Sequence, residues 1–285
     1  MSVDLVHSIA SAREAVARFR GAGKTIGLVP TMGALHAGHG RLIGTARAEC
    51  DFVAVSIFVN PIQFDREDDY ERYPRTLASD AGFAEAHGAD LVFAPEIAEV
   101  YPRRQRAYVD VEALTEHLCG KFRPGHFRGV ATVVAKLLNI VQPDRAYFGQ
   151  KDAQQLAVIR RMVADLNLPV EIVGVPTVRE ADGLALSSRN QHLSAGERAV
   201  APLLYESLRA AEAAIAGGVR DPERARQTAL TVLAREPRIR VEYFEIVDPE
   251  DLQPVTEIAG PVLVAAAVWL GGTRLIDNVV ASGWV

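Results

Sequence analysis

Cysteine is scarce in this 285-residue chain, which has only Cys50 and Cys119, far apart and in no Cys-x-x-Cys pair. The sequence therefore offers no cysteine-based metal or redox motif, and two reduced thiols indicate a cytoplasmic protein. Long apolar runs are missing as well. The strongest run, residues 262–270, ends at Gly271-Gly272, whereas a membrane span needs about 20 apolar residues. No basic start followed by an apolar run opens the chain, so we expect neither a secretory signal nor a membrane partner.

Blocks of like charge are also absent, and the formal net charge is −5. Nucleic-acid-binding proteins usually present a clustered basic face, so we expect no nucleic-acid partner. Apolar residues, by contrast, are plentiful at 49% of the chain. A substantial core is therefore possible, and the length favours one large or two modest domains.

Apolar segments alternate between strand-like and helix-like patterns before Pro176. This alternation predicts an α/β fold with a Rossmann-like, doubly wound parallel sheet. We expect Pro30 to end the first of these strands, because proline cannot donate to a ladder. The expected strands are residues 25–29, 51–59, 90–93, 145–148 and 170–175. The expected helices are 8–20, one that buries Leu42, Ile43 and Ala46, 77–87, 130–141 and 156–166, with surface loops at 67–73 and 123–129.

The pattern changes after Pro176. Residues 178–193 are polar, and two helices, 195–216 and 222–235, are expected before strands at 241–247, 262–270 and 274–279. Helices followed by strands predict a smaller α+β domain with antiparallel pairing. We therefore expect two domains, residues 1–177 and 178–285.

A His-x-Gly-His motif follows the first expected strand and opens a helix. The N-terminus of that helix offers free N–H groups and a positive dipole, which suit a phosphate. His36 and His39 are three residues apart and share a helix face, so both imidazoles can donate to phosphoryl oxygens in a transition state. In isolation, such a pair could equally cap an ordinary turn. The pair could also suggest a metal site, but no cysteine or third histidine lies nearby to complete a set of ligands.

Polar segments also follow two other expected strands, at Asn60 to Gln63 and at Gly149 to Asp152. Ligands of doubly wound sheets bind beyond the carboxyl ends of the strands, so we expect these segments to converge with the histidines. Lys151 is placed to clamp a phosphate, while Asp152 either contacts a nucleotide or caps the next helix. Residues 187–189 offer two hydroxyls and a guanidinium to an anion, or form an ordinary polar loop.

Seven segments together resemble the pantothenate synthetase family, the AMP-forming pantoate–β-alanine ligases of the HIGH nucleotidyltransferase superfamily. The resemblance covers nearly the whole chain, and the segments occur in the family's order. They are residues 30–39, 57–64, 73–76, 123–130, 149–155, 183–190 and 274–278.

The resemblance implies a two-step reaction with ATP as substrate and Mg2+ as its metal ion. The carboxylate of pantoate attacks the α-phosphorus of ATP to give pantoyl adenylate and pyrophosphate. The amine of β-alanine then displaces AMP and forms pantothenate. The resemblance also implies a homodimer. Because residues 187–189 lie just past the change of pattern at Pro176, we expect the 178–285 domain to act as a lid over a first domain that binds ATP and pantoate, by movement of that domain or of the linker.

The family's pattern further implies the roles of individual residues. His39 is the proton donor to the phosphates, and the catalytic set is His36, His39, Lys151, Ser187, Ser188 and Arg189. The ATP-binding set adds Pro30, Thr31, Met32, Gly33, Ala34, Leu35, Ala37, Gly38, Gly149, Gln150, Asp152, Val178 and Leu186. Pantoate and β-alanine are assigned to Asn60, Gln63, Tyr73, Arg128 and Gln155.

Three residues depart from the family's pattern. Gly40 stands where relatives tend to carry a bulkier residue, and glycine near a helix start costs roughly 0.5–1 kcal/mol, so we expect that start to fray. Gln150 replaces a common glutamate and removes one negative charge. Asp80 is a candidate Mg2+ ligand without the acidic neighbour that some relatives have, so ATP and water are expected to hold most of the ion.

Two other functions are compatible with parts of the pattern. The first is a HIGH-superfamily enzyme that leaves the nucleotidyl group on its product. An aminoacyl-tRNA synthetase is disfavoured by the lack of a basic appendage. The second is an ATP-binding sensor without chemistry, which leaves Asn60, Gln63 and Gln155 unexplained.

Overall fold

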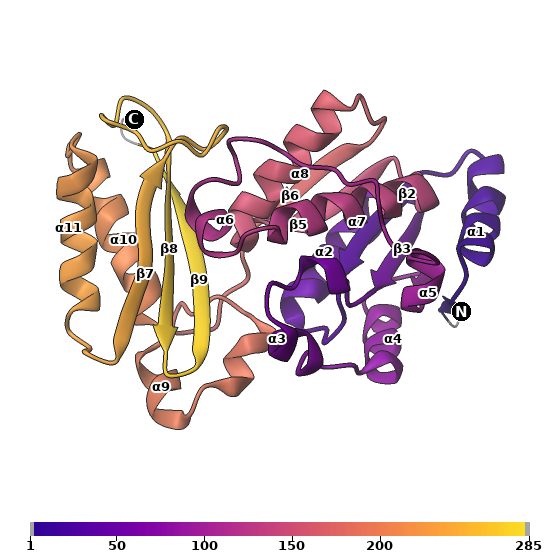
Figure 1. Ribbon diagram of the computed structural model, residues 1–285, viewed down its shortest axis with the longest axis horizontal. Coiled ribbons are helices and arrows are strands. Elements are labelled where there is room, and N and C mark those ends of the chain that lie inside the picture. The colour runs from indigo at the N-terminus through magenta and orange to yellow at the C-terminus, as the bar shows by residue number, and fades with distance from the viewer. Residues whose placement is uncertain (1–2, 283–285) are drawn as a thin grey trace. The chain divides into compact units, whose positions relative to one another are not determined.

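The computed structural model describes residues 3–282, which form two compact units (Figure 1). The first unit comprises the described chain up to Val111 together with residues 123–150 and 158–176. The second comprises residues 112–122, 151–157 and the described chain from Thr177. Two short segments that precede residue 178 in the sequence thus belong to the second unit. A domain boundary between 177 and 178 stays a prediction.

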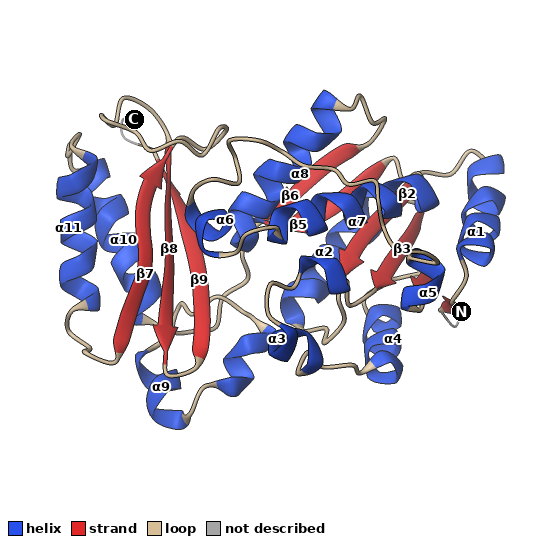
Figure 2. Ribbon diagram, in the orientation of Figure 1, coloured by secondary structure: helices blue, strands red, loops and turns tan. Residues whose placement is uncertain are grey.

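The first unit is built on a six-stranded sheet in which all strand pairs are parallel (Figure 2). The predicted α/β class and parallel sheet are therefore confirmed. The strands lie in the order β1-β4-β3-β2-β5-β6. Their bounds are β1 Asp4–Val6, β2 Ile26–Thr31, β3 Phe52–Ile57, β4 Leu91–Phe93, β5 Arg145–Gly149 and β6 Glu171–Val175.

β3 is buried at every residue except its last. This burial indicates that both faces of the sheet are covered by helices. Val53 and Val55 pack into a core that includes Leu42, Ile43 and Ala46 of α2, as the helical spacing predicted. The helices are α1 Ile9–Gly21, α2 Ala37–Glu49, α3 Glu67–Glu71, α4 Leu77–Ala86, α5 Ile97–Val100, α7 His126–Val141 and α8 Ala153–Asp165, with a 3-10 turn η1 at Pro61–Gln63. The amino-terminal part of α8 belongs to the second unit.

Several local predictions in the first unit were wrong. Pro30 does not end β2, which continues to Thr31 and pairs with β3. Because β5 pairs with β2 only at Gly27 and Leu28, one edge of β2 is free at Pro30, and proline is tolerated at such an edge. The expected loop at 67–73 contains α3, and α7 begins at His126 within the expected loop at 123–129.

The second unit holds an antiparallel sheet of β7 Ile239–Val247, β8 Val262–Leu270 and β9 Thr273–Ala281. The predicted antiparallel pairing is confirmed. Two helices, α10 Leu203–Ala216 and α11 Pro222–Leu233, lie side by side along one face of this sheet (Figure 2). Shorter elements are α6 Leu118–Phe122, η2 Gln150–Asp152, η3 Ser188–His192 and α9 Ala195–Val200.

The predicted helix 195–216 is interrupted between α9 and α10, where Pro202 lacks the N–H needed to continue it. The alternate residues of β8, Val264, Ala266 and Val268, enter the core beneath α10 and α11. None of the helices within residues 3–282 is both long enough and apolar enough to cross a membrane.

Candidate active site

The His-x-Gly-His motif lies beyond the carboxyl end of β2, where the strand order of the sheet reverses. From β2 the chain proceeds to β3 on one side, and β5 and β6 are added on the other. Such a switch point is where doubly wound sheets bind ligands. Gly149 ends β5, the strand adjacent to β2, and Gln150 follows it as the first residue of η2.

His36 and His39 form a reciprocal cap at the start of α2. His36 is the N-cap residue, and its Nδ1 accepts a hydrogen bond from the Gly38 N–H at 3.1 Å. The Nδ1 of His39 accepts from the His36 N–H at 3.2 Å, and the two ring centroids are 4.2 Å apart. A neutral imidazole that accepts at Nδ1 carries its proton at Nε2. The cap therefore makes both Nε2–H groups hydrogen-bond donors.

Asp80 holds the loop that precedes these histidines. Its Oδ2 accepts from the Ala34 N–H at 3.0 Å and its Oδ1 from the Leu35 N–H at 2.8 Å. The loop needs this support because Gly33 and Ala34 both have positive φ, +86° and +51°, a conformation that is unfavourable for alanine. A Cβ at Gly33 would also lie 3.0 Å from the Asp80 carboxylate.

Gln63 is buried and its side-chain amide is oriented by its neighbours. Its Oε1 accepts from Asn60 Nδ2 at 3.0 Å, and its Nε2 donates to Met32 Sδ at 3.0 Å. Asn60 is only 1% exposed, donates also to the Gly129 carbonyl, and accepts from the Tyr101 hydroxyl at 2.8 Å. Burial raises the pKa of Tyr101, so this hydroxyl remains a donor.

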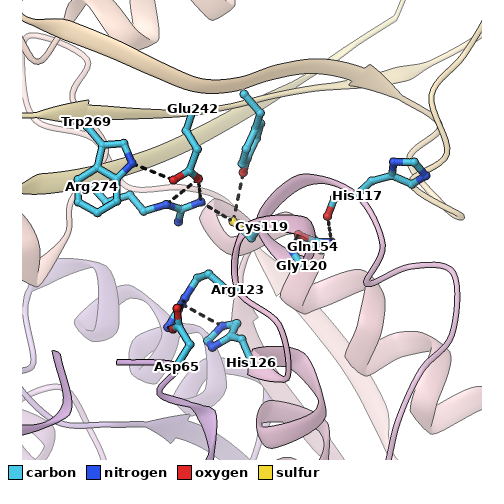
Figure 3. Close-up of polar contacts among 11 residues, drawn as sticks. Asp65, His117, Cys119, Gly120, Arg123, His126, Gln154, Glu242, Trp269 and Arg274 are labelled. Atoms are coloured by element: carbon cyan, nitrogen blue, oxygen red, sulfur yellow. Dashed lines mark hydrogen bonds and ion pairs between the residues drawn. The ribbon is translucent and has the colours of Figure 1, made fainter. Parts of the chain in front are cut away.

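An ion pair ties the segment after Gln63 to the start of α7 (Figure 3). Arg123 contacts Asp65 at 2.8 Å, and His126 Nδ1 lies 2.7 Å from the Gln63 carbonyl. Burial acts to raise the pKa of Asp65, but the charge and hydrogen bond of Arg123 outweigh it and lower that pKa. Gly129 is required here, because a Cβ would lie 2.3 Å from the Ile62 carbonyl oxygen.

Two other predicted substrate residues lie near this segment. The Tyr73 ring packs edge-on against Phe64, the residue after Gln63. The exposed Arg128 guanidinium lies over the Tyr108 ring, 4.1 Å from its centroid. A substrate role for either residue stays a prediction.

The second unit carries the other predicted phosphate-binding residues. Lys151 lies in η2, and its backbone carbonyl accepts from Asn278 Nδ2 at 2.8 Å. Asp152 directly precedes α8, where Gln155 lies one residue beyond the buried Gln154. Gln154 donates to the Leu114 and His117 carbonyls and accepts from the Gly120 N–H, so it fixes residues 114–120 (Figure 3).

Ser187, Ser188 and Arg189 follow a short hairpin at residues 178–186. Arg179 and Ala185 bridge in antiparallel fashion, and the Leu186 N–H donates to the Val178 carbonyl at 2.9 Å. Ser187 then caps η3 by accepting from the Arg189 N–H. The predicted polar segment is thus an ordered turn that presents consecutive polar side chains.

A largely buried polar cluster on β7–β9 joins residues that sequence reasoning did not combine (Figure 3). Glu242 accepts from Arg274 at 2.5 Å and from Trp269 at 2.8 Å. Burial acts to raise the pKa of Glu242, but these hydrogen bonds hold it below its ordinary value. Cys119 Sγ lies 3.2 Å from the Tyr243 hydroxyl. This cluster secures α6 to the sheet and contains none of the predicted site residues.

The structure explains Gly40 by packing. Gly40 is buried, and a Cβ there would lie 2.6 Å from two atoms of the His87 ring. His87 itself stacks on Phe83 with ring centroids 4.1 Å apart. Gly40 thus leaves room for the side chains of Phe83 and His87, and the expected fraying of this helix start stays a prediction. The other departure, Gln150, donates to the Gly174 carbonyl at 3.4 Å.

No group of three or more His, Cys, Asp or Glu side chains that could hold a metal ion occurs among residues 3–282. Asp80 also accepts from the Thr76 hydroxyl at 3.0 Å. With its two backbone partners, it already receives three hydrogen bonds. These contacts fit an anchor of the histidine loop better than a metal ligand.

Sequence reasoning missed Tyr101, Asn278 and the role of Asp80, because each acts through a contact between distant parts of the chain. Asn278 lies in a segment that the family resemblance had marked but to which no role was given. Asp80 had been considered only as a metal ligand. No local pattern singles out Tyr101.

A histidine-capped helix at the switch point of a parallel sheet is typical of a Rossmann-like α/β protein that binds its ligand beyond the carboxyl ends of the strands. The family model described as pantoate-beta-alanine ligase matches residues 4–280. This chain belongs to that family.

Individual relatives agree with the family model. A bifunctional pantoate ligase/cytidylate kinase from Thermosynechococcus vestitus is 58% identical over 89% of this chain, which spans 50% of that longer relative. A crystal structure of pantothenate synthetase from Thermus thermophilus is 47% identical with a TM-score of 0.92, over 97% of this chain and 99% of that one. The Francisella tularensis pantoate-beta-alanine ligase, crystallised with beta-gamma ATP and beta-alanine, is 33% identical with a TM-score of 0.81, over 98% of both chains.

Proposed function

We propose that this protein condenses pantoate with β-alanine at the expense of ATP, through a pantoyl adenylate. In the first step a carboxylate oxygen of pantoate bonds to the α-phosphorus, and the bond to pyrophosphate breaks. In the second step the amine of β-alanine bonds to the acyl carbon, the bond to AMP breaks, and the amine loses a proton. The products are pantothenate, AMP and pyrophosphate.

The phosphates are bound by the histidine cap in this proposal. His36 and His39 donate hydrogen bonds from their Nε2–H groups to phosphate oxygens. His39 is also the residue that donates a proton to the phosphates. Lys151, Ser187, Ser188 and Arg189 add positive charge and hydrogen bonds as pyrophosphate leaves. Phosphoryl-group chemistry depends mainly on such positioning and charge stabilisation. The remaining ATP contacts come from the loop residues 30–38, from 149, 150 and 152, and from Val178 and Leu186.

Pantoate is held by Gln63 and Gln155. The Nε2 of Gln63 donates to a thioether sulfur, which is a weak acceptor, so an oxygen of pantoate can replace Met32 with a gain in hydrogen bonding. An amide also orients the attacking carboxylate without neutralising its charge, whereas a lysine would neutralise it. Asn60 contributes by orienting Gln63. Tyr73 and Arg128 line the pantoate and β-alanine side of the site.

Mg2+ enters with ATP as part of the substrate, held mainly by the phosphates and water. We also propose a homodimer that acts in the cytoplasm, with residues 178–285 as a lid. The family resemblance supports the dimer, and the two free, buried cysteines are compatible with a reducing compartment. Sedimentation at several concentrations tests the dimer directly.

The observation that carries the proposal is the reciprocal cap of His36 and His39 at the switch point, in a chain of this family. Mass spectrometry of the products formed from ATP, pantoate and β-alanine is the test. We expect pantothenate and AMP in equal amounts, and neither when β-alanine is omitted. A product that retains the nucleotidyl group would instead identify another HIGH-superfamily reaction, and binding without turnover would identify a sensor.

A further inference from the structure

Two consecutive residues of β9, Asp277 and Asn278, hold two separate segments of the second unit. Neighbouring residues of a strand point to opposite faces of the sheet. Asp277 shares its face with Leu275 and Ala281, which enter the core beneath α10, and it binds the hairpin of residues 178–186. Asn278 points the other way and donates to the Lys151 carbonyl at 2.8 Å.

The contact on the Asp277 side is a buried, two-pronged ion pair. Arg179 donates to Asp277 Oδ2 at 2.5 Å and to Oδ1 at 3.0 Å. The Asp277 side chain is 2% exposed, and the Arg179 guanidinium lies 3.8 Å from the centroid of the Tyr205 ring. Burial raises the pKa of Asp277, an effect that Arg179 opposes. A two-pronged pair of this kind fixes orientation as well as distance.

Arg179 transmits this fixed position along the hairpin. Its guanidinium donates to the Gly183 carbonyl at 3.1 Å, and its backbone bridges to Ala185. The Gly183 N–H in turn donates to the Glu180 carbonyl at 2.9 Å. The hairpin therefore places Leu186 and the Ser187 to Arg189 turn that follows it.

The two contacts are also linked to each other. The Asn278 N–H donates to Asp277 Oδ1 at 2.8 Å, and Arg179 reaches the Asn278 carbonyl at 3.4 Å. One short stretch of β9 thus holds both Lys151 and the hairpin that leads into the Ser187 to Arg189 turn, although the two segments are far apart in the sequence.

We propose that Asp277 and Asn278 form a shared anchor that positions Lys151 on one side and the Ser187–Arg189 turn on the other for adenylation. The anchor rests on the proposed function, in which both segments contact the phosphates of ATP. Asp277, Asn278 and Arg179 are positioning residues and touch no substrate. Small displacements of such groups are costly, since about 1 Å of misplacement can slow a reaction by on the order of 100-fold.

Double-mutant cycles on pantoate-dependent pyrophosphate exchange test the Asn278 side. We expect Asn278→Ala to lower the exchange rate about 10-fold, the size expected for one lost hydrogen bond, with an unchanged KM for pantoate. In a Lys151→Ala background the same change should have at most about a twofold effect, because the backbone carbonyl remains but the ammonium group that the contact positions is absent. In a Ser188→Ala background the full effect should persist.

The Arg179 side should show the opposite pattern. Arg179→Lys keeps the charge but loses the two-pronged contact. Its effect should fall in a Ser188→Ala background, which removes one of the three side chains that the turn presents, and should persist in full with Lys151→Ala. If Arg179→Lys does not fold, the Asn278 cycle tests the anchor by itself. Asn139→Ala is the matched control, because the exposed Asn139 amide donates to the Ala135 carbonyl within α7, outside the anchor, and exchange should be unchanged.

A merely structural role would give equal losses in both backgrounds, with a fall in thermal stability. Effects that multiply in every background would therefore overturn the anchor, as would wild-type exchange in Asn278→Ala. A wild-type protein without pantoate-dependent exchange would overturn the proposed function itself. The crossed pattern in an active wild-type background supports the anchor.

Discussion

The carboxylate of Asp80 accepts the backbone N–H of Ala34, a residue held at a φ of +51°. An asparagine at position 80 would turn an N–H2 group toward one of the backbone donors, which would loosen the histidine loop. We expect Asp80→Asn to raise the KM for ATP and to slow exchange by about 10- to 100-fold.

The Mg2+ dependence distinguishes this anchoring role from metal binding. The Mg2+ concentration that gives half-maximal exchange should be the same in Asp80→Asn and wild type. A variant that needed much more Mg2+ would show that Asp80 is a metal ligand. Asp69→Asn, an exposed change on α3, is the control and should be silent.

Tyr101→Phe removes one hydroxyl and leaves Asn60 Oδ1 without its donor. A buried group left unsatisfied costs about 1–3 kcal/mol, part of which should appear as a less well-oriented Gln63. We expect the KM for pantoate to rise about 10-fold while the KM for ATP stays constant. Tyr108→Phe, at a 41% exposed tyrosine, should change neither constant. Equal effects on both KM values would argue against orientation of Gln63.

Gly40 and Gly44 lie on the same helix and should respond oppositely to alanine. At Gly44 a Cβ would meet nothing within 4 Å, so Gly44→Ala should stabilise the protein by about 0.5–1 kcal/mol. At Gly40 the Cβ would overlap the His87 ring, so Gly40→Ala should destabilise by about 1–3 kcal/mol. Adding His87→Ala should recover part of that loss in thermal unfolding. No recovery would mean that His87 is not the obstacle.

The ion pair of Asp65 and Arg123 predicts a pH dependence. The pKa of Asp65 is lowered in the folded protein, so its contribution to stability is present above the ordinary aspartate pKa, about 4, and is lost as the pH falls through the lower folded value. Asp65→Asn should cost about 1 kcal/mol at pH 7. The difference from wild type in urea unfolding should shrink below about pH 4. A difference that grew on acidification would have the wrong sign.

The sequence predicted the elements with strong periodicity, such as β3, α2 and β8, because burial on one or both faces is written into their apolar pattern. It also predicted that polar segments would follow β2, β3 and β5. Short elements were missed: β1, α5 and α6 each have three to five residues, too few for a period to show. The supporting contacts of Asp80, Tyr101 and Asn278 were also missed, since their partners are 41 to 127 positions away. Such pairs exist only once the chain is folded.

Exchange of labelled pyrophosphate into ATP tests the central claim most directly. Reversible formation of an acyl adenylate from ATP requires pantoate but not β-alanine. We therefore expect label in ATP with pantoate alone and none with β-alanine alone. His39→Ala should lower this exchange together with the full reaction. Exchange that strictly required β-alanine would contradict a separate adenylation step and the account built on it.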